Sequence, residues 1–151
     1  MQDTVVAGTF AGILGDLVKL AVNLVLYIIG VAGTTSLHIA AAALLPARVA
    51  QGPPFLMLGL VVEMLVAAGL GILGAYLVRA TGRDFLWLKG IVYGGIIWVI
   101  GYGLLAPLLA PRWLVLPNLA TSMAMLAAHL AYGLTTLFIV GRYALRAARV
   151  Q

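Results

Sequence analysis

Five polar side chains lie inside long apolar stretches of the sequence, where burial excludes such groups unless they have partners. They are Asp16, Lys19, Asn23, Glu63 and His129. Carboxylates and imidazoles bind and release protons, and burial moves their pKa values readily. We expect Asp16 and Glu63 to titrate, with Lys19 as their counter-charge. His129 then offers a second proton site, and Asn23 orients its neighbours by hydrogen bonds.

The composition indicates a membrane protein. Hydrophobic residues make up 64% of the 151 residues and charged residues only 9%, whereas a soluble domain carries roughly a quarter charged residues. The chain has no cysteine, which excludes thiolate metal sites and thiol redox centres. Basic residues at the ends of membrane spans explain the net charge of +5. We therefore expect contact with membrane lipids and no nucleic-acid partner.

Four apolar stretches are long enough to cross a bilayer, whose hydrocarbon core of about 30 Å needs roughly 20 helical residues. They cover about 4–31, 55–78, 85–110 and 119–140. Another apolar piece, about 36–45, is too short to span and predicts an interfacial or re-entrant helix. Short links between the later spans require antiparallel neighbours. The sequence thus predicts one all-α membrane domain over 1–151, an integral membrane four-helix antiparallel bundle with a short helix in its first loop.

The basic residues predict the orientation, because cytoplasmic loops carry an excess of Lys and Arg. Six lie on the side shared by the termini and the second loop: Arg79, Arg83, Lys89, Arg142, Arg146 and Arg149. Only Arg48 and Arg112 lie on the opposite side. We therefore expect both termini in the cytoplasm.

The polar residues of the first span share a helix face with small residues. Asp16, Lys19 and Asn23 fall within about 60° of one another on a helix of 100° per residue. Gly8 and Gly12 lie on nearly the same stripe. Stripes of small residues allow membrane helices to pack closely. The polar stripe is therefore also the face on which another helix can approach.

The second and fourth spans repeat this arrangement. Glu63 is bracketed by Gly59 and Ala67, and His129 is followed one turn later by Gly133. Counted at 1.5 Å per residue, Glu63, His129 and the polar stripe of the first span reach the same depth to within about one helical turn. We therefore expect them to meet in the bundle interior.

Several interpretations of such a meeting remain open. A buried polar network can fix helix packing, with Lys19 neutralising one carboxylate and the other bonding to His129 or Asn23. Alternatively, the groups can load and release protons or cations. A metal held by Asp16, Glu63 and His129 is disfavoured because Lys19 would repel the cation. Haem would need a second axial ligand besides His129, and we expect no cofactor and no resident metal. Nothing in the sequence forms a nucleophile turn such as GxSxG, so we do not expect an enzyme.

Two segments resemble small multi-span membrane proteins of uncharacterised function from Firmicutes-type bacteria. The first is Thr81-Gly82-Arg83-Asp84 followed by Lys89-Gly90, Gly94 and Trp98; the second is His129 followed by Tyr132-Gly133. The polar first span, from Gly15 to Tyr27, is similar too. The resemblance implies a bacterial inner-membrane protein and draws attention to His129 and Lys89, but it supplies no activity.

Two functional hypotheses follow. In the first, the polar residues form a membrane-embedded site that binds or passes a proton, an ion or a small solute. In the second, the chain is a structural or accessory membrane subunit whose buried polar network only fixes helix packing and oligomerisation. Four spans leave little room for an enclosed path, so we expect a homo-oligomer, with a dimer favoured.

Overall fold

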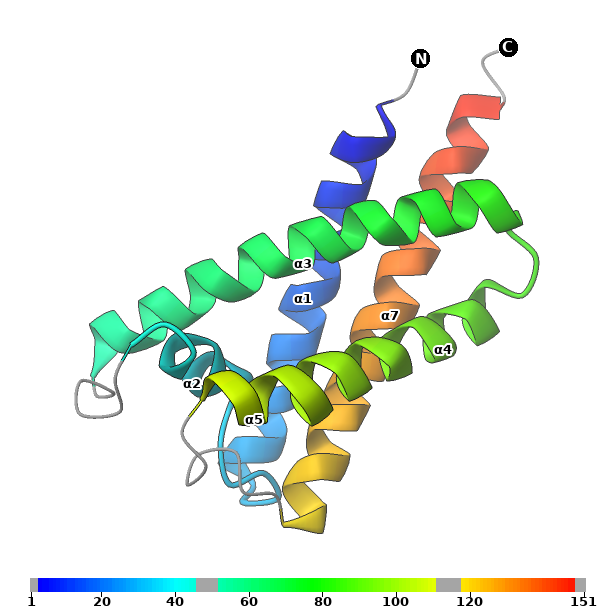
Figure 1. Ribbon diagram of the computed structural model, residues 1–151. Coiled ribbons are helices and arrows are strands. Elements are labelled where there is room, and N and C mark those ends of the chain that lie inside the picture. The colour runs from blue at the N-terminus through cyan, green and yellow to red at the C-terminus, as the bar shows by residue number, and fades with distance from the viewer. Residues whose placement is uncertain (1–2, 46–51, 111–117, 149–151) are drawn as a thin grey trace.

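The computed structural model describes residues 3–45, 52–110 and 118–148 and is helical wherever these residues form regular structure (Figure 1). The membrane-length helices are α1 (Thr4–Ile28), α3 (Pro53–Thr81) and α7 (Leu119–Ala148). A fourth consists of α4 (Leu86–Trp98), the π-helix η2 (Val99–Leu105) and α5 (Ala106–Leu109), which together run unbroken over Leu86–Leu109. A short helix, α2 (Ser36–Ala42), lies between α1 and α3 in the sequence. The protein is therefore an all-α bundle of four helices, each long and apolar enough to cross a membrane.

The helix ends differ from the predicted spans by a few residues. α1 ends at Ile28 rather than near 31, because Gly30 takes a left-handed φ of 78° and its N–H bonds back to Tyr27. α3 starts earlier than predicted because prolines occupy its first turn. α7 continues past 140 to 148, and α2 covers 36–42 rather than 36–45. Three residues used for the orientation, Arg48, Arg112 and Arg149, lie outside the described residues.

α1 and α3 pack through a seam of small residues. Gly12 of α1 lies against the backbone of Ala67 and Gly71 on α3, and Gly8 lies against Gly71 and Ile72. A Cβ atom added at Gly12 or Gly71 would collide with backbone atoms of the opposite helix. The stripe of small residues predicted on the first span is thus confirmed as a face of close helix approach.

α4 and α7 form a second pair of the same kind. Gly94 of α4 lies against the carbonyl of His129, and Gly133 of α7 lies against Gly90 and Gly94. α1 then joins the two pairs, since it also packs along α7. One link between them is the hydroxyl of Thr136, which donates to the carbonyl of Ala11 over 3.4 Å.

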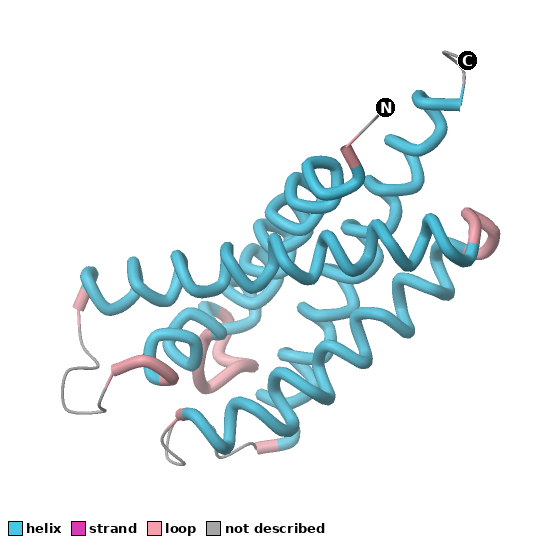
Figure 2. The backbone as a smooth tube through the Cα atoms, turned by 45° about the horizontal axis from the view of Figure 1, so that its top comes forward, coloured by secondary structure: helices cyan, strands magenta, loops and turns pink. Residues whose placement is uncertain are grey.

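The helices follow the order α3, α1, α7, α4 around the bundle, so α3 and α4 scarcely touch although they are neighbours in sequence. They meet at the turn 82–85 and diverge away from it (Figure 2). This turn is capped by Lys89, whose Nζ donates to the carbonyls of Thr81 and Gly82 over 3.0 and 2.9 Å. The divergence leaves room between α3 and the α4–η2–α5 segment.

The start of α1 and the end of α7 lie at the same end of the bundle (Figure 1). Arg79, near the end of α3, belongs to this end as well, because its guanidinium donates to the hydroxyl of Thr4 over 3.3 Å. The termini and Arg79 share this end because the four helices run alternately up and down.

α2 lies at the opposite end, between the diverging ends of α3 and α5 (Figure 2). Ala41 and Ala42 pack with Phe55, Ala106 and Ala110 in a small apolar core. Burial lowers the pKa of His38 on this helix, so its imidazole is neutral at pH 7. α2 is thus a packed end-cap and, at seven residues, does not span.

We expect Gly71→Ala to destabilise the protein, because the new methyl group meets the backbone of α1. Such overpacking costs about 1–3 kcal/mol, measurable by thermal unfolding in detergent micelles. Gly69→Ala on the same helix is the matched control, since a Cβ there meets nothing within 4 Å. Equal unfolding temperatures for the two variants would contradict the close α1–α3 contact.

Candidate functional site

Three of the predicted polar residues form one ion-pair cluster. The Nζ atom of Lys19 lies 2.6 Å from Oδ1 of Asp16 and 3.3 Å from Oε1 of Glu63. All three side chains are buried. Asp16 and Lys19 are three residues apart on α1, whereas Glu63 comes from α3. A single ammonium group therefore serves two carboxylates from two helices.

The α1–α3 seam places these groups together. Gly12 contacts Ala67 within the seam between these two antiparallel helices. One turn further along α1 is Asp16, and one turn back along α3 is Glu63, so both carboxylates lie at the same level. The predicted convergence of these two faces therefore has a simple geometric cause.

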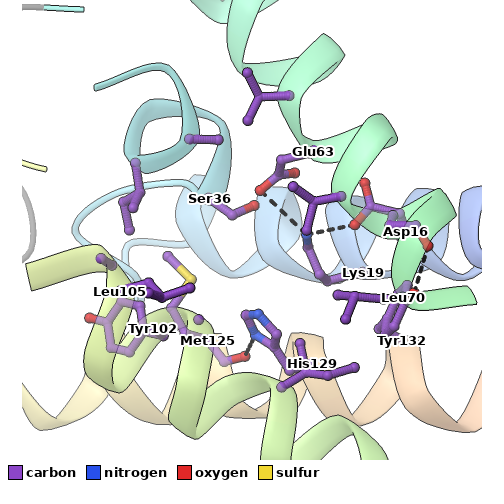
Figure 3. Close-up of a pocket in the computed structure, with 18 of the residues that line it drawn as sticks. Asp16, Lys19, Ser36, Glu63, Leu70, Tyr102, Leu105, Met125, His129 and Tyr132 are labelled. Atoms are coloured by element: carbon purple, nitrogen blue, oxygen red, sulfur yellow. Dashed lines mark hydrogen bonds and ion pairs between the residues drawn. The ribbon is translucent and has the colours of Figure 1, made fainter. Parts of the chain in front are cut away.

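His129 faces the same space from α7 (Figure 3). Its Nδ1 atom is 2.7 Å from the carbonyl oxygen of Met125, one turn earlier on the same helix. Among the described residues it forms no hydrogen bond with Asp16 or Glu63, contrary to one of the networks considered from sequence. The Met125 carbonyl already occupies one ring nitrogen, so the other nitrogen remains for chemistry within the cavity.

Asn23 lies apart from the ion-pair cluster. Its Oδ1 accepts the backbone N–H of Ser36 over 2.9 Å, and its Nδ2 donates to the sulfur of Met125 over 3.4 Å. It thereby ties α1 to the start of α2 and to α7. We expected Asn23 to orient the neighbouring polar groups of the site, but its hydrogen bonds involve neither carboxylate. They hold the start of α2 instead.

The cluster lies at the edge of a cavity of about 320 Å³ between α3 and the α4–η2–α5 segment. α1 and α7 form its floor, and α2 lines one end (Figure 3). Most of its wall is aliphatic; examples are Ile39, Val62, Ile97 and Leu105. A cavity of this size and character falls at the lower end of the range for small-molecule sites, roughly 300–1,000 Å³.

Several buried polar atoms in this cavity have no hydrogen-bond partner among the described residues. They are Oδ2 of Asp16, Oγ of Ser36, Oε2 of Glu63 and the hydroxyl of Tyr102, and all four residues line the cavity. Buried polar groups normally find partners, and an unpaired one costs about 1–3 kcal/mol. These atoms are almost fully buried, so a molecule in the cavity supplies the missing partners only after small side-chain shifts.

Sequence reasoning missed two residues of the site. Ser36, whose hydroxyl points toward the Glu63 carboxylate in Figure 3, was hidden because α2 was expected at the membrane surface. Tyr102, the other residue, lines the cavity from η2. η2 is a π-helix, a form that often occurs at functional sites, but its sequence carries no signal that distinguishes it from an α-helix.

Two other tyrosines act in helix packing. The Tyr132 hydroxyl donates to the carbonyl of Ala67 over 2.9 Å. The Tyr93 hydroxyl donates to the carbonyl of Leu70. Both bonds tie α3 to the α4–α7 pair beside the cavity, and the two rings stack with centroids 6.5 Å apart.

The donor set does not form a metal site. Within the described residues, no group of three His, Cys, Asp or Glu side chains is placed to hold a metal ion. Asp16 and Glu63 instead share the ammonium of Lys19. With all three ionised, the cluster carries one net negative charge.

The chain was also compared with known proteins. No protein-family model, curated protein or solved structure matches it.

We expect Lys19→Met and Glu63→Gln to differ sharply in stability. Lys19→Met leaves two buried carboxylates without their cation, which costs about 3–5 kcal/mol. Glu63→Gln leaves the neutral Asp16–Lys19 pair intact and should cost no more than one ordinary hydrogen bond, about 1 kcal/mol. Thermal unfolding in detergent micelles measures both.

A neutral triple variant is the control for Lys19→Met. Combining it with Asp16→Asn and Glu63→Gln removes every charge from the cluster, so most of the lost stability should return. If Glu63→Gln is as damaging as Lys19→Met, the net charge of the cluster is not what governs its stability.

Proposed function

We propose that this polytopic membrane protein binds one positive charge at a time at the Asp16–Lys19–Glu63 cluster. The charge is a proton or the cationic group of a small solute. The observation that carries the proposal is the charge balance of the cluster, in which two buried carboxylates share one ammonium beside a cavity.

An unbalanced charge at this depth is costly. A lone charge at mid-bilayer costs at least about 2.5–3.5 kcal/mol even on the most lenient insertion scale. A proton or cation that reaches the cluster removes that cost. Glu63 is the natural receiver, because its Oε1 lies farther from Lys19 than Oδ1 of Asp16 does and its Oε2 has no partner among the described residues.

His129 supports the same function as a second proton site. Its imidazole lines the cavity that also contains Glu63, with one nitrogen held by the Met125 carbonyl. A proton or a donor group that enters the cavity therefore meets two kinds of acceptor, a carboxylate and an imidazole.

A purely structural role explains less of the arrangement. The shorter ion pair, Asp16–Lys19, lies within α1 and joins no helices. Helix packing already has the glycine seams and the tyrosine hydrogen bonds to α3. A network needed only for packing would not leave carboxylate oxygens unpaired beside a cavity.

The structural or accessory subunit remains the rival function, favoured by one observation. The 3.3 Å contact between Lys19 and Glu63 joins α1 to α3. Under that role Glu63→Gln should lower the unfolding temperature or dissociate an oligomer. Under the binding role the variant stays folded and loses its binding.

Binding of radiolabelled methylammonium to the purified protein in nanodiscs tests the proposed function. We expect saturable binding to the wild type that falls as the pH is lowered, because protons and methylammonium compete for one negative charge. Glu63→Gln should weaken binding at least about tenfold, equivalent to 1.4 kcal/mol.

Asp84→Asn is the matched control for this substitution. It also converts a carboxylate into an amide, but Asp84 is exposed in the turn between α3 and α4 and does not line the cavity. Binding that is equal in the wild type and Glu63→Gln would refute the proposed function.

We also propose that the chain lies in a bacterial inner membrane with both termini in the cytoplasm. The excess of basic residues at the end of the bundle that carries the termini supports this orientation, and the resemblance of the two sequence segments supports the location. A C-terminal fusion to green fluorescent protein should fluoresce, and a fusion to alkaline phosphatase should be inactive. The reverse pair of results would place the termini outside.

A further inference from the structure

We infer that the cavity binds an apolar molecule with one protonated amine, and that this molecule enters from the lipid between α3 and η2. The inference rests on the proposed function, because it names the solute class for the same cluster. It is drawn from the cavity wall, the unpaired polar atoms and the position of the mouth.

The wall of the cavity selects an apolar body. Apart from the ion-pair cluster, Ser36, Met125, His129 and the tyrosines, the lining is aliphatic or small. A compact inorganic cation would leave most of this surface unfilled. A hydrocarbon chain or ring gains from burial there, roughly fourfold in affinity for each methylene group.

The polar edge of the cavity selects an amine. The unpaired atoms of Asp16 and Glu63 are both carboxylate oxygens, which accept hydrogen bonds and attract positive charge. A protonated primary amine brings three N–H donors and the single positive charge that the cluster lacks.

The mouth of the cavity is apolar. Val66 on α3 and Ile100 and Leu105 on η2 line the cavity and are each about half exposed. In a membrane-spanning bundle, exposed aliphatic side chains in mid-helix face lipid hydrocarbon. The mouth thus opens toward the bilayer, where hydrophobic amines concentrate.

An ordinary phospholipid headgroup fits less well. Its phosphate would place a negative charge beside Asp16 and Glu63, while the one ammonium of the cavity is already held by both carboxylates. Ethanolamine lipids carry the right amine, but this phosphate accompanies it. The structure therefore favours a free hydrophobic amine over a lipid.

Binding of an alkylammonium series to the protein in phosphatidylcholine nanodiscs tests the inference. The probes are methyl-, butyl- and octylammonium, with octanol and octanoate as neutral and anionic counterparts. Affinity should rise steeply with chain length, and only the ammonium probes should bind saturably. Nanodiscs that contain the Glu63→Gln variant measure how much of each probe simply partitions into the lipid. This amount is subtracted from the signal of the wild type.

A pair of glycine variants tests the cavity itself. Gly101 lines the cavity and has open space at its Cβ position, so Gly101→Leu should fill the cavity without a clash and weaken octylammonium binding at least about tenfold. Gly95→Leu on α4 is the control, because Gly95 also has open space but lies outside this cavity. Unfolding temperatures of both variants verify folding; should Gly101→Leu not fold, the chain-length series decides alone.

The route of entry has its own test, which the lack of native cysteine makes simple. Leu105→Cys should react with a membrane-dissolved maleimide, should resist a charged water-soluble one, and should be protected by octylammonium. A disulfide-linked dimer under mild oxidation would instead show that a second copy covers the mouth, and it would overturn entry from lipid.

The outcomes separate this inference from the proposed function. If methylammonium binds through Glu63 but octylammonium binds no more tightly, the proposed function stands and the inference fails. If no ammonium probe binds, both fail. If phosphatidylethanolamine nanodiscs abolish octylammonium binding, the ligand is the lipid headgroup and the free amine is excluded.

Discussion

The contact between α1 and α3 at their small residues determines the position of every other part of the site. Because the two backbones touch at Gly12 and Ala67, the residues one turn away, Asp16 and Glu63, come within reach of one ammonium. Larger side chains in the seam would separate the helices and leave Glu63 without its cation. In a membrane, water cannot take over the role of that cation. The close packing of α1 against α3 is therefore also what supplies Glu63 with its counter-charge.

The shared ammonium makes the two carboxylates unequal. Lys19 is bound closely by Asp16 within one helix and more loosely by Glu63 across two. The first pair is set by α1 alone and persists through any movement of α3. Glu63 is therefore the carboxylate that can exchange Lys19 for another partner. The neighbouring Ser36 hydroxyl points toward the Glu63 carboxylate and stays within its reach during such an exchange (Figure 3).

The four spans and the polar faces could be predicted because both depend on local patterns, namely apolar length and residues spaced by three or four. The contacts of Asn23 could not, because they depend on where the chain returns after α1: the start of α2 folds back so that Ser36 N–H reaches Asn23. The missing bond between His129 and a carboxylate has a local cause, the Met125 carbonyl one turn away. η2 also escaped prediction, since its composition suits an α-helix equally well.

The shape of the cavity follows from how α3 is fastened. Tyr93 of α4 and Tyr132 of α7 bond to two successive turns of α3, on the side of the cavity nearer the α3–α4 turn, so α3 is held to the α4–α7 pair there. Beyond this point they diverge, and α2 occupies the space between their far ends. The described helices thus close the cavity at both ends and leave its side open between Val66 and η2. With the proposed entry from lipid, such a site disfavours hydrated ions and favours solutes already dissolved in the bilayer.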